Sequence, residues 1–413
     1  MPLAKTAQAG IQSCLDETTK AGSGTPGLVF CAIDKNGEYL SETVSGVNGV
    51  EASIAKPMTL DSVFWIASCT KMITGIACLQ LHEQGKLSID SADELYKLCP
   101  EMKSKKVLVA PGKYEDLKGE ITIRKLLTHT AGFGYSFFNE RLRDAALPAG
   151  WDEFSGDAED YLNMPLVNQP GSRWEYGINI DWAGIAVMRA TGLNLDDYFK
   201  RHIFAPLGIE NISFFPSAHM KENLVNAQYV RPDGTVINVD HLYRRPVALA
   251  GTSKQKDIFT SGGAGCFAKP REYCQIIATL LNNGTSPTTK KQILKPATVD
   301  LMFENSIPEF PDFGRTAIPN AKPFWTNPLP QLYPQEGDPG QGWGLSFMLT
   351  IEPGPTGRGR NTAWWAGIAN LFWWADREKG VGGIIAAQKV PFGDGAVMGA
   401  WGNCEAQVYA GLS

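Results

Sequence analysis

The sequence predicts an α/β domain that is split by an all-α, mainly helical insertion. Strand-like segments lie near both ends of the chain, and helical patches broken by loops fill its middle. This order places residues 1–92 and 255–413 in one α/β part and residues 93–254 in the insertion. A length of 413 residues suits one large domain with an insertion, or two domains.

The N-terminal part is expected to form a helix, a β-hairpin and a second helix. Residues 7–20 have helical spacing and lead into the glycine-rich stretch AGSGTPG. An apolar run at residues 28–33 and a β-rich run at residues 38–44 flank the sequence DKNG, a pattern typical of a hairpin. After residue 68, apolar residues recur at helical spacing up to Gly85, which predicts an amphipathic helix with a glycine stop.

The C-terminal part returns to strands. Apolar runs at residues 345–351, 370–375 and 383–387 are the candidates, and residues 376–380 (DREKG) form a plausible turn between the last two. Residues 305–342 are rich in proline and show little periodicity. Loops of that length in a compact protein are usually functional or disordered, so we expect this segment to border the substrate pocket as a mobile flap.

Composition excludes several classes of protein. The net charge of -5 and the pI near 5.7 argue against a nucleic-acid partner. The N-terminus lacks the apolar segment of a secretory signal, and no run of about 18 apolar residues suggests a membrane span. The eight cysteines show no C-x-x-C spacing. We therefore expect a cytoplasmic protein with reduced thiols, without a membrane contact, a metal site or a cofactor.

One candidate nucleophile is left after the common catalytic motifs are excluded. The chain has no G-x-S-x-G, no H-E-x-x-H and no phosphate-binding G-x-x-x-x-G-K-[ST]. It does have Ser68 three residues before Lys71, and positions i and i+3 share one face of a helix. A helix N-terminus offers free amides to an oxyanion, and a desolvated lysine can act as a base near neutral pH.

The Ser-x-x-Lys pattern occurs three times and is weak by itself. Pro57 follows the match at residues 53–56 and disfavours a helix there. The match at residues 253–256 lies in a polar stretch with no apolar helix after it. Only Ser68 opens a strong helical pattern, although an ordinary N-cap serine would fit the same position.

Four segments in order resemble the serine β-lactamase-related superfamily, which includes class C β-lactamases, penicillin-binding proteins and family VIII esterases. They are residues 64–90, with SCTK, 121–135 (ITIRKLLTHTAGFGY), 169–184 (QPGSRWEYGINIDWAG) and 259–273 (FTSGGAGCFAKPREY). The resemblance covers nearly the whole chain and implies a β-lactamase/transpeptidase-like fold, an antiparallel sheet flanked by helices. Within it, residues 174–184 and 297–305 are most similar to fungal acyltransferases of lovastatin biosynthesis.

The resemblance implies roles for the first two motifs. Ser68 matches the nucleophile and Lys71 its partner. The second motif is normally Tyr-x-Asn, whose tyrosine exchanges protons with the serine and the leaving group. A strict match occurs at Tyr161, but the family context of Pro-Gly, four residues and tyrosine selects Tyr176. Asn179 comes one place late, so its role stays open, and we assign it to the substrate pocket.

The third motif departs from that of β-lactamases. Lys-[Ser/Thr]-Gly is absent, and the matching segment is Trp365-Ala366-Gly367, the Trp-x-Gly of esterases in this superfamily. The resemblance implies that the glycine lets the strand approach the substrate and that the amides of Ile368 and Ser68 form the oxyanion hole. Loss of the lysine removes the cation that would hold a β-lactam or peptide carboxylate.

Three aromatic residues near the motifs receive provisional roles. Tyr135 and Trp343 are expected to line the substrate pocket, whereas His129 is expected to be structural because buried polar residues commonly satisfy backbone groups.

The sequence therefore predicts a serine enzyme that acts on small-molecule esters, lactones or thioesters, with water or a hydroxyl compound as acyl acceptor. An acyl carrier or synthase is a candidate partner for the donor. A non-catalytic binding or scaffold protein of the same fold, and a β-lactamase or peptidase, remain as alternatives.

Overall fold

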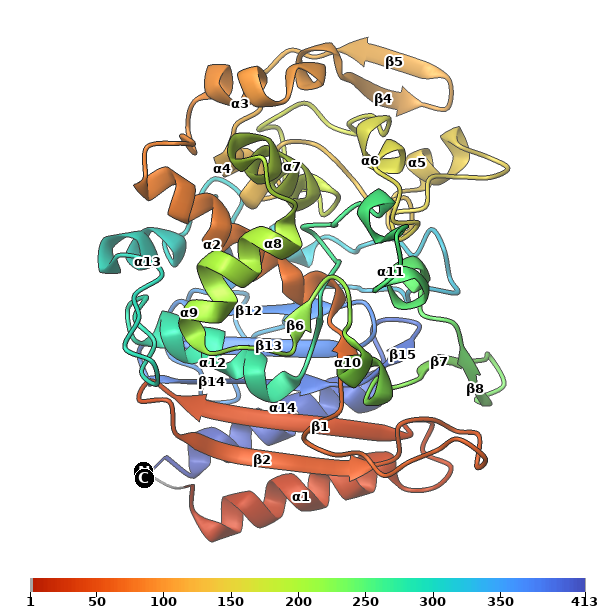
Figure 1. Cartoon of the computed structure of the whole chain (residues 1–413), viewed down its shortest axis with the longest axis vertical. Coiled ribbons are helices and arrows are strands. Elements are labelled where there is room, and N and C mark those ends of the chain that lie inside the picture. The colour runs from red at the N-terminus through yellow and green to blue at the C-terminus, as the bar shows by residue number, and fades with distance from the viewer. Residues whose placement is uncertain (1–2, 413) are drawn as a thin grey trace.

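A seven-stranded antiparallel sheet joins the two ends of the chain in the computed structural model, which describes residues 3–412 (Figure 1). Its strand order is β10-β11-β12-β13-β14-β1-β2. The strands are β1 (Gly27–Asp34), β2 (Tyr39–Gly46), β10 (Gly342–Trp343), β11 (Met348–Thr350), β12 (Thr362–Gly367), β13 (Leu371–Asp376) and β14 (Val381–Ala386). Because β1 pairs with β14, with Val29 opposite Ala386, the prediction that distant strands share one sheet is confirmed.

Both predicted hairpins are present. The Asp34 carboxylate accepts hydrogen bonds from the amides of Asn36 and Glu38 and so closes the turn between β1 and β2. The turn at residues 376–380 joins β13 to β14. The strand expected at residues 345–351 is shorter than predicted, because Ser346 has a φ of +90° and β11 begins only at Met348.

Helices cover both faces of the sheet. Phe372 stacks on Trp401 of α14 (Gly395–Ala410), with ring centroids 4.8 Å apart, whereas the next residue, Trp373, contacts Tyr273 of α12 (Pro270–Leu281). Successive side chains of a strand point to opposite faces, so α14 and α12 lie on opposite sides of the sheet. Helix α1 (Lys5–Thr19), predicted from the sequence, packs beside α14.

Helix α2 (Thr70–Glu83) was expected to be amphipathic, and this prediction is wrong. Every residue from Thr70 to Leu81 is buried. The helix lies between the sheet and α7 (Asn179–Thr191), so neither face meets solvent (Figure 1). Gly85, with a φ of +66°, follows its end as expected.

The segment at residues 93–254 is mainly helical but also contains strands. Its other helices are α3 (Ala92–Leu98), α4 (Ile123–Leu127), α5 (Glu140–Ala145), α6 (Glu159–Leu162), α8 (Leu195–Phe199), α9 (Ala205–Leu207), α10 (Ala218–Glu222) and α11 (Arg244–Leu249). Its strands are β4 (Lys106–Ala110), β5 (Lys113–Asp116), β6 (Ile212–Ser213), β7 (Ala227–Val230) and β8 (Val236–Val239).

Two of these strands pair with strands outside the segment. β6 pairs with β9 (Phe267–Ala268), which also pairs with β3 (Phe64–Trp65). β7 pairs with β15 (Lys389–Val390).

Helix α13 (Pro296–Met302) precedes the proline-rich segment. The division into two domains at residues 92 and 254 stays a prediction.

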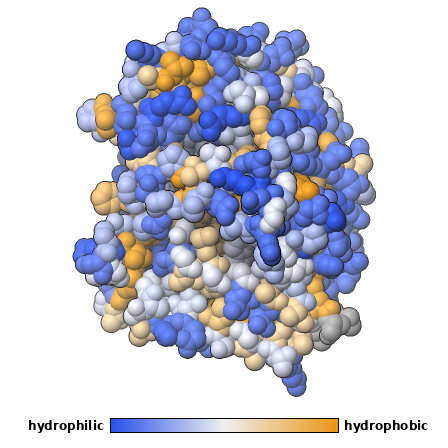
Figure 2. Space-filling model, turned by 180° about the vertical axis from the view of Figure 1, so that it is seen from behind, coloured by the Kyte–Doolittle hydropathy of each residue, from blue (hydrophilic) through white to orange (hydrophobic). Residues whose placement is uncertain are grey.

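The surface seen from behind is mainly hydrophilic, with hydrophobic residues in several small groups (Figure 2). Between residues 3 and 412, no helix is both long and apolar enough to cross a membrane. All eight cysteines are free, and seven of them are buried.

A buried ion pair ties α14 to the loop before β12 and generates the first prediction. Arg358 donates to both carboxylate oxygens of Glu405, at 2.5 and 2.8 Å, and neither side chain is more than 1% exposed. Arg358→Met should lower the free energy of unfolding by roughly 3–5 kcal/mol, because it leaves an uncompensated buried carboxylate. Arg358→Met combined with Glu405→Leu should lose less, as measured by urea unfolding. Additive losses would contradict the pairing.

Candidate active site

Ser68 lies in a tight turn that enters α2. The turn is a 3-10 helix of residues Ala67–Cys69, and Ala67 has a φ of +44°, which is rare for a residue with a Cβ. Such strained backbone persists only where surrounding structure holds it, and it is common at active sites. Ser68 is 9% exposed, and its amide belongs to the first turn, where amides lack intrahelical acceptors.

The amine of Lys71 is fully buried and has three neighbours. Its Nζ atom lies 3.0 Å from Ser68 Oγ, 3.0 Å from Tyr135 Oη and 2.8 Å from the carbonyl oxygen of Gly263. The carbonyl can only accept a hydrogen bond. A neutral amine would therefore donate to Gly263 and Tyr135 and keep its lone pair for the Ser68 hydroxyl.

Burial favours that neutral form. Desolvation lowers the pKa of Lys71 to about 7, while the carboxylate of Asp181 opposes the shift. Both protonation states of the amine are then populated near neutral pH. A base with such a pKa is well matched to proton transfer at that pH.

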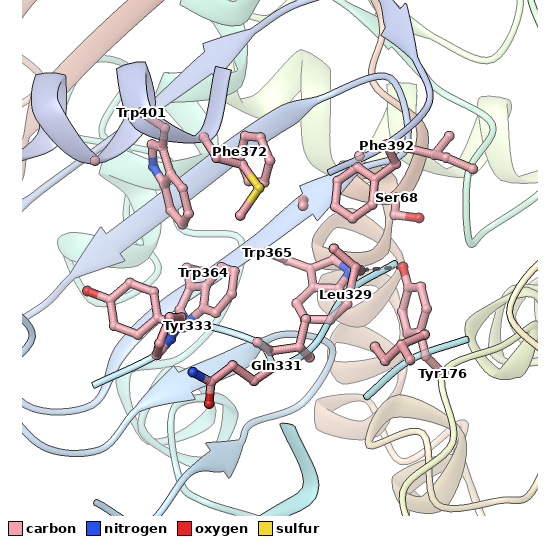
Figure 3. Close-up of a pocket in the computed structure, with 18 of the residues that line it drawn as sticks. Ser68, Tyr176, Leu329, Gln331, Tyr333, Trp364, Trp365, Phe372, Phe392 and Trp401 are labelled. Atoms are coloured by element: carbon pink, nitrogen blue, oxygen red, sulfur yellow. Dashed lines mark hydrogen bonds between the residues drawn. The ribbon is translucent and has the colours of Figure 1, made fainter. Parts of the chain in front are cut away.

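Tyr176 lies beside both Ser68 and Lys71. Its Oη accepts a hydrogen bond from Trp365 Nε1 at 2.8 Å (Figure 3), and Lys71 Nζ lies 4.8 Å from the centre of its ring. Burial raises the pKa of Tyr176, and hydrogen bonding with Ser68 and Trp365 opposes this only in part. The phenol therefore stays protonated. The hydroxyl of Tyr161, the strict Tyr-x-Asn match, instead donates to the backbone carbonyl of Glu153.

Tyr135 lies deeper than expected from the sequence. It was predicted to line the pocket, but its hydroxyl contacts Lys71, and its ring is 5.2 Å from that of Tyr176. The only signal in the sequence was its place at the end of the second segment, residues 121–135. The structure thus brings two phenols, not one, to the amine of Lys71.

The third motif packs directly against the Ser68 turn. A Cβ added to Gly367 would lie 2.6 Å from the carbonyl oxygen of Ile66, so this glycine lets β12 approach the turn itself. All predicted members of the oxyanion site line one cavity: Ser68, Trp365, Ala366, Gly367 and Ile368. The amides of Ser68 and Ile368 are the candidate oxyanion donors.

Asn179 and Trp343 lie behind the cavity and are not among the residues that line it. Asn179 Nδ2 contacts His129 Nδ1 at 3.0 Å and donates to the carbonyl of Phe133 at 2.9 Å. Trp343 packs edge-on against Trp365, with ring centroids 4.6 Å apart. The prediction that both residues line the pocket is therefore wrong. The Asn179 side chain hydrogen-bonds to neighbouring protein groups, and the Trp343 ring packs against other aromatic rings.

His129 holds the segment that carries Tyr176. Its carbonyl accepts from the amide of Glu175, and its Nδ1 accepts from the amide of Gly177. Because Nδ1 accepts, the ring proton of the neutral form is on Nε2. The structure places His129 as a support for the backbone, as the sequence predicted.

The cavity beside Ser68 has a volume of about 220 Å³ and a mainly apolar wall that is rich in aromatic side chains. Ser68 and Tyr176 lie at one side, and Trp401 and Tyr333 at the other (Figure 3). The charged side chains of its wall, Arg358 and Glu405, bind each other. The proline-rich segment contributes Ile318, Leu329, Gln331, Leu332, Tyr333 and Pro334. The prediction that this segment borders the pocket is confirmed.

Comparison with known proteins gives consistent results. The sequence profile of the family described as Beta-lactamase matches residues 15–403. The chain is 31% identical to "Lovastatin esterase" of Penicillium rubens, over 93% of this chain and 94% of that protein. It is 28% identical to "Monacolin J acid methylbutanoyltransferase" of Aspergillus terreus, over 93% and 92%. A solved structure of a mutant of simvastatin synthase from Aspergillus terreus superposes with a TM-score of 0.81 at 26% identity, over 99% and 96% of the two chains.

The close approach at Gly367 generates the second prediction. Gly367→Ala should lower kcat/KM for p-nitrophenyl butyrate by about 10²-fold, because its Cβ would push β12 away from the Ser68 turn. Gly399→Ala is the matched control, since that glycine lies within α14 with no atom near its added Cβ. The control should keep full activity. Equal activity of Gly367→Ala and wild type would contradict the assigned role of β12.

Proposed function

The chain belongs to the beta-lactamase family and is an enzyme that acts on esters, and we propose that it transfers acyl groups from small molecules through an acyl-Ser68 intermediate. One observation carries the proposal: a buried lysine amine, matched to neutral pH, lies 3.0 Å from the hydroxyl of Ser68. That is the geometry of an activated nucleophile.

Acylation follows from this geometry. Ser68 Oγ attacks the ester carbonyl while its proton passes to the neutral amine of Lys71. The amides of Ser68 and Ile368 stabilise the oxyanion, and Tyr176 gives its proton to the leaving oxygen or sulfur as the carbon–heteroatom bond breaks. The proton on Lys71 then returns to Tyr176, so both groups regain their resting state.

Deacylation uses the same groups in reverse. Water or a bound hydroxyl compound loses its proton to the Lys71–Tyr176 pair and attacks the acyl carbonyl. Ser68 leaves and takes up a proton from the pair. Hydrolysis and transfer thus differ only in the acceptor.

The cavity supports a hydrophobic and largely uncharged substrate. Its wall is mainly apolar and rich in aromatic side chains, and its two charged side chains neutralise each other. We propose an ester or thioester of a secondary metabolite, by similarity to relatives whose names specify lovastatin and monacolin J acid. Delivery of the acyl group by an acyl carrier or synthase is the finer proposal, which a carrier-bound thioester would test.

The two alternatives from the sequence have less support. A β-lactamase or peptidase needs a cation where this chain has Trp365. A scaffold protein has no use for a buried, desolvated lysine in contact with a serine, which is costly to retain without function.

The protonation state of Lys71 generates the third prediction. The amine accepts a proton only when it is neutral. A plot of kcat/KM against pH should therefore rise with an inflection near pH 7, and kcat/KM should be low at pH values below 7.

Lys71→Met and Tyr176→Phe should each lower kcat by about 10²-fold or more. Tyr161→Phe serves as the control and should stay near wild type. An inactive Tyr161→Phe with an active Tyr176→Phe would show that the wrong tyrosine was assigned.

The fourth prediction tests the acyl-enzyme and its acceptor. Incubation with p-nitrophenyl butyrate, a rapid acid quench and peptide mapping should place the butyryl group on Ser68. Ser53 and Ser253, both exposed, should stay unlabelled.

Because bound alcohols compete with water in an apolar site, rising concentrations of a bulky polycyclic alcohol should divert product from free acid to new ester, as measured by mass spectrometry. If free acid is the only product with every alcohol tested, acyl transfer to alcohols is contradicted and the enzyme is an esterase.

A further inference from the structure

A buried carboxyl group lies near the amine of Lys71, on the other side of Gly263. Asp181 belongs to the first turn of α7 and is 1% exposed. Its Oδ1 atom accepts from Ser261 Oγ at 2.6 Å and from the amide of Gly263 at 3.0 Å. Its Oδ2 atom has no hydrogen-bond partner within residues 3–412. Burial raises the pKa of this carboxyl group, and the charge of Lys71 and the hydrogen bonds from Ser261 and Gly263 oppose that rise. The ionised form in this position therefore depends on a nearby positive charge.

Gly263 connects this carboxylate to the nucleophile. Its amide donates to Asp181, and its carbonyl accepts from Lys71 Nζ at 2.8 Å. A Cβ at this position would lie 2.3 Å from Asp181 Oδ2, so the residue must be a glycine for the carboxylate to fit. One residue thus links the charged groups of α2 and α7.

A purely structural role is the simpler reading, and Asp196 shows what such a role looks like. Asp196, in the first turn of α8, also accepts from a serine hydroxyl and the following amide, Ser213 at 2.7 Å and Phe214 at 2.9 Å. Its cation is Lys200, at 2.6 Å, which is half exposed. The cation that acts on Asp181 is Lys71, the buried amine of the active site.

We propose that Asp181 is a positioning residue that acts through Lys71, as the buried counter-charge of its ammonium form and as the anchor of the Gly263 carbonyl that orients the amine. This inference depends on the proposed function, in which Lys71 is the base. Asp181 would then determine the pH at which Lys71 loses its proton.

The other titratable groups around the pair are neutral near pH 7. Burial raises the pKa of Cys69 and of the facing phenols, and it lowers the pKa of His129. The phenols are Tyr135, Tyr161, Tyr176 and Tyr243. Among the groups between residues 3 and 412 that act on Lys71, ionised Asp181 is therefore the source of negative charge near pH 7.

The fifth prediction tests this role with Asp181→Asn, which keeps the acceptor oxygen for Ser261 and Gly263 but removes the charge. A carboxylate stabilises the ammonium form, so its removal lowers the pKa of Lys71. The acidic limb of kcat/KM for p-nitrophenyl butyrate should move to lower pH, by about one unit or more. Asp196→Asn, the matched control, should leave the limb unmoved. If the acidic limb of the kcat/KM profile of Asp181→Asn lies at the same pH as in the wild type, the proposal is overturned.

A stability comparison gives a second test that needs no catalysis. Lys71→Met leaves the Asp181 carboxylate buried without its cation, whereas Lys71→Met with Asp181→Asn removes both charges. The double variant should therefore have a higher Tm than Lys71→Met, near pH 7. A lower Tm would overturn the pairing. Absence of a butyryl group on Ser68 in the wild type would instead contradict the proposed function and leave the pairing to be judged by Tm.

Discussion

A buried amine is the constraint on which this active site depends. Desolvation makes the charged form of Lys71 costly, so the chain must surround the nitrogen with acceptors. They come from the Ser68 turn, from Tyr135 and from Gly263, and the last is 192 residues away along the sequence. The Ser68 turn and the loops that carry Tyr135 and Gly263 therefore have to pack together with the accuracy of single hydrogen bonds.

That accuracy is achieved by backbone at two glycines. Gly263 lies between Lys71 and Asp181 and hydrogen-bonds to both. Gly367 lets β12 contact the carbonyl of Ile66. A side chain at either place would overlap its neighbours and separate the catalytic groups. Ala67 adds a third constraint, because its positive φ turns the chain so that Ser68 faces the cavity while α2 continues behind it. Packing and chemistry thus depend on the same few backbone positions.

Much of the sheet was predictable because its signals are local. An apolar run and a β-rich run on either side of the turn DKNG specify a hairpin without reference to the rest of the chain. The nature of α2 was not predictable in this way. Its polar residues are satisfied by protein rather than water, as when Thr74 donates to the carbonyl of Gly262 at 2.6 Å. Periodicity cannot show whether a polar residue meets solvent or a distant loop, and the contact between Tyr135 and Lys71 is hidden for the same reason.

The distinction between hydrolysis and transfer lies outside the motifs that the sequence reveals. Lys71 and Tyr176 move the same protons whether the acceptor is water or an alcohol, so their identities carry no information on it. The remaining variable is which molecule occupies the space above the acyl carbonyl. Residues 318–334, which carry none of the named helices or strands, supply part of the wall of the cavity beside Ser68. Substitutions there can change the fit of an acceptor without moving Ser68, and so the acceptor can change while the catalytic geometry is retained.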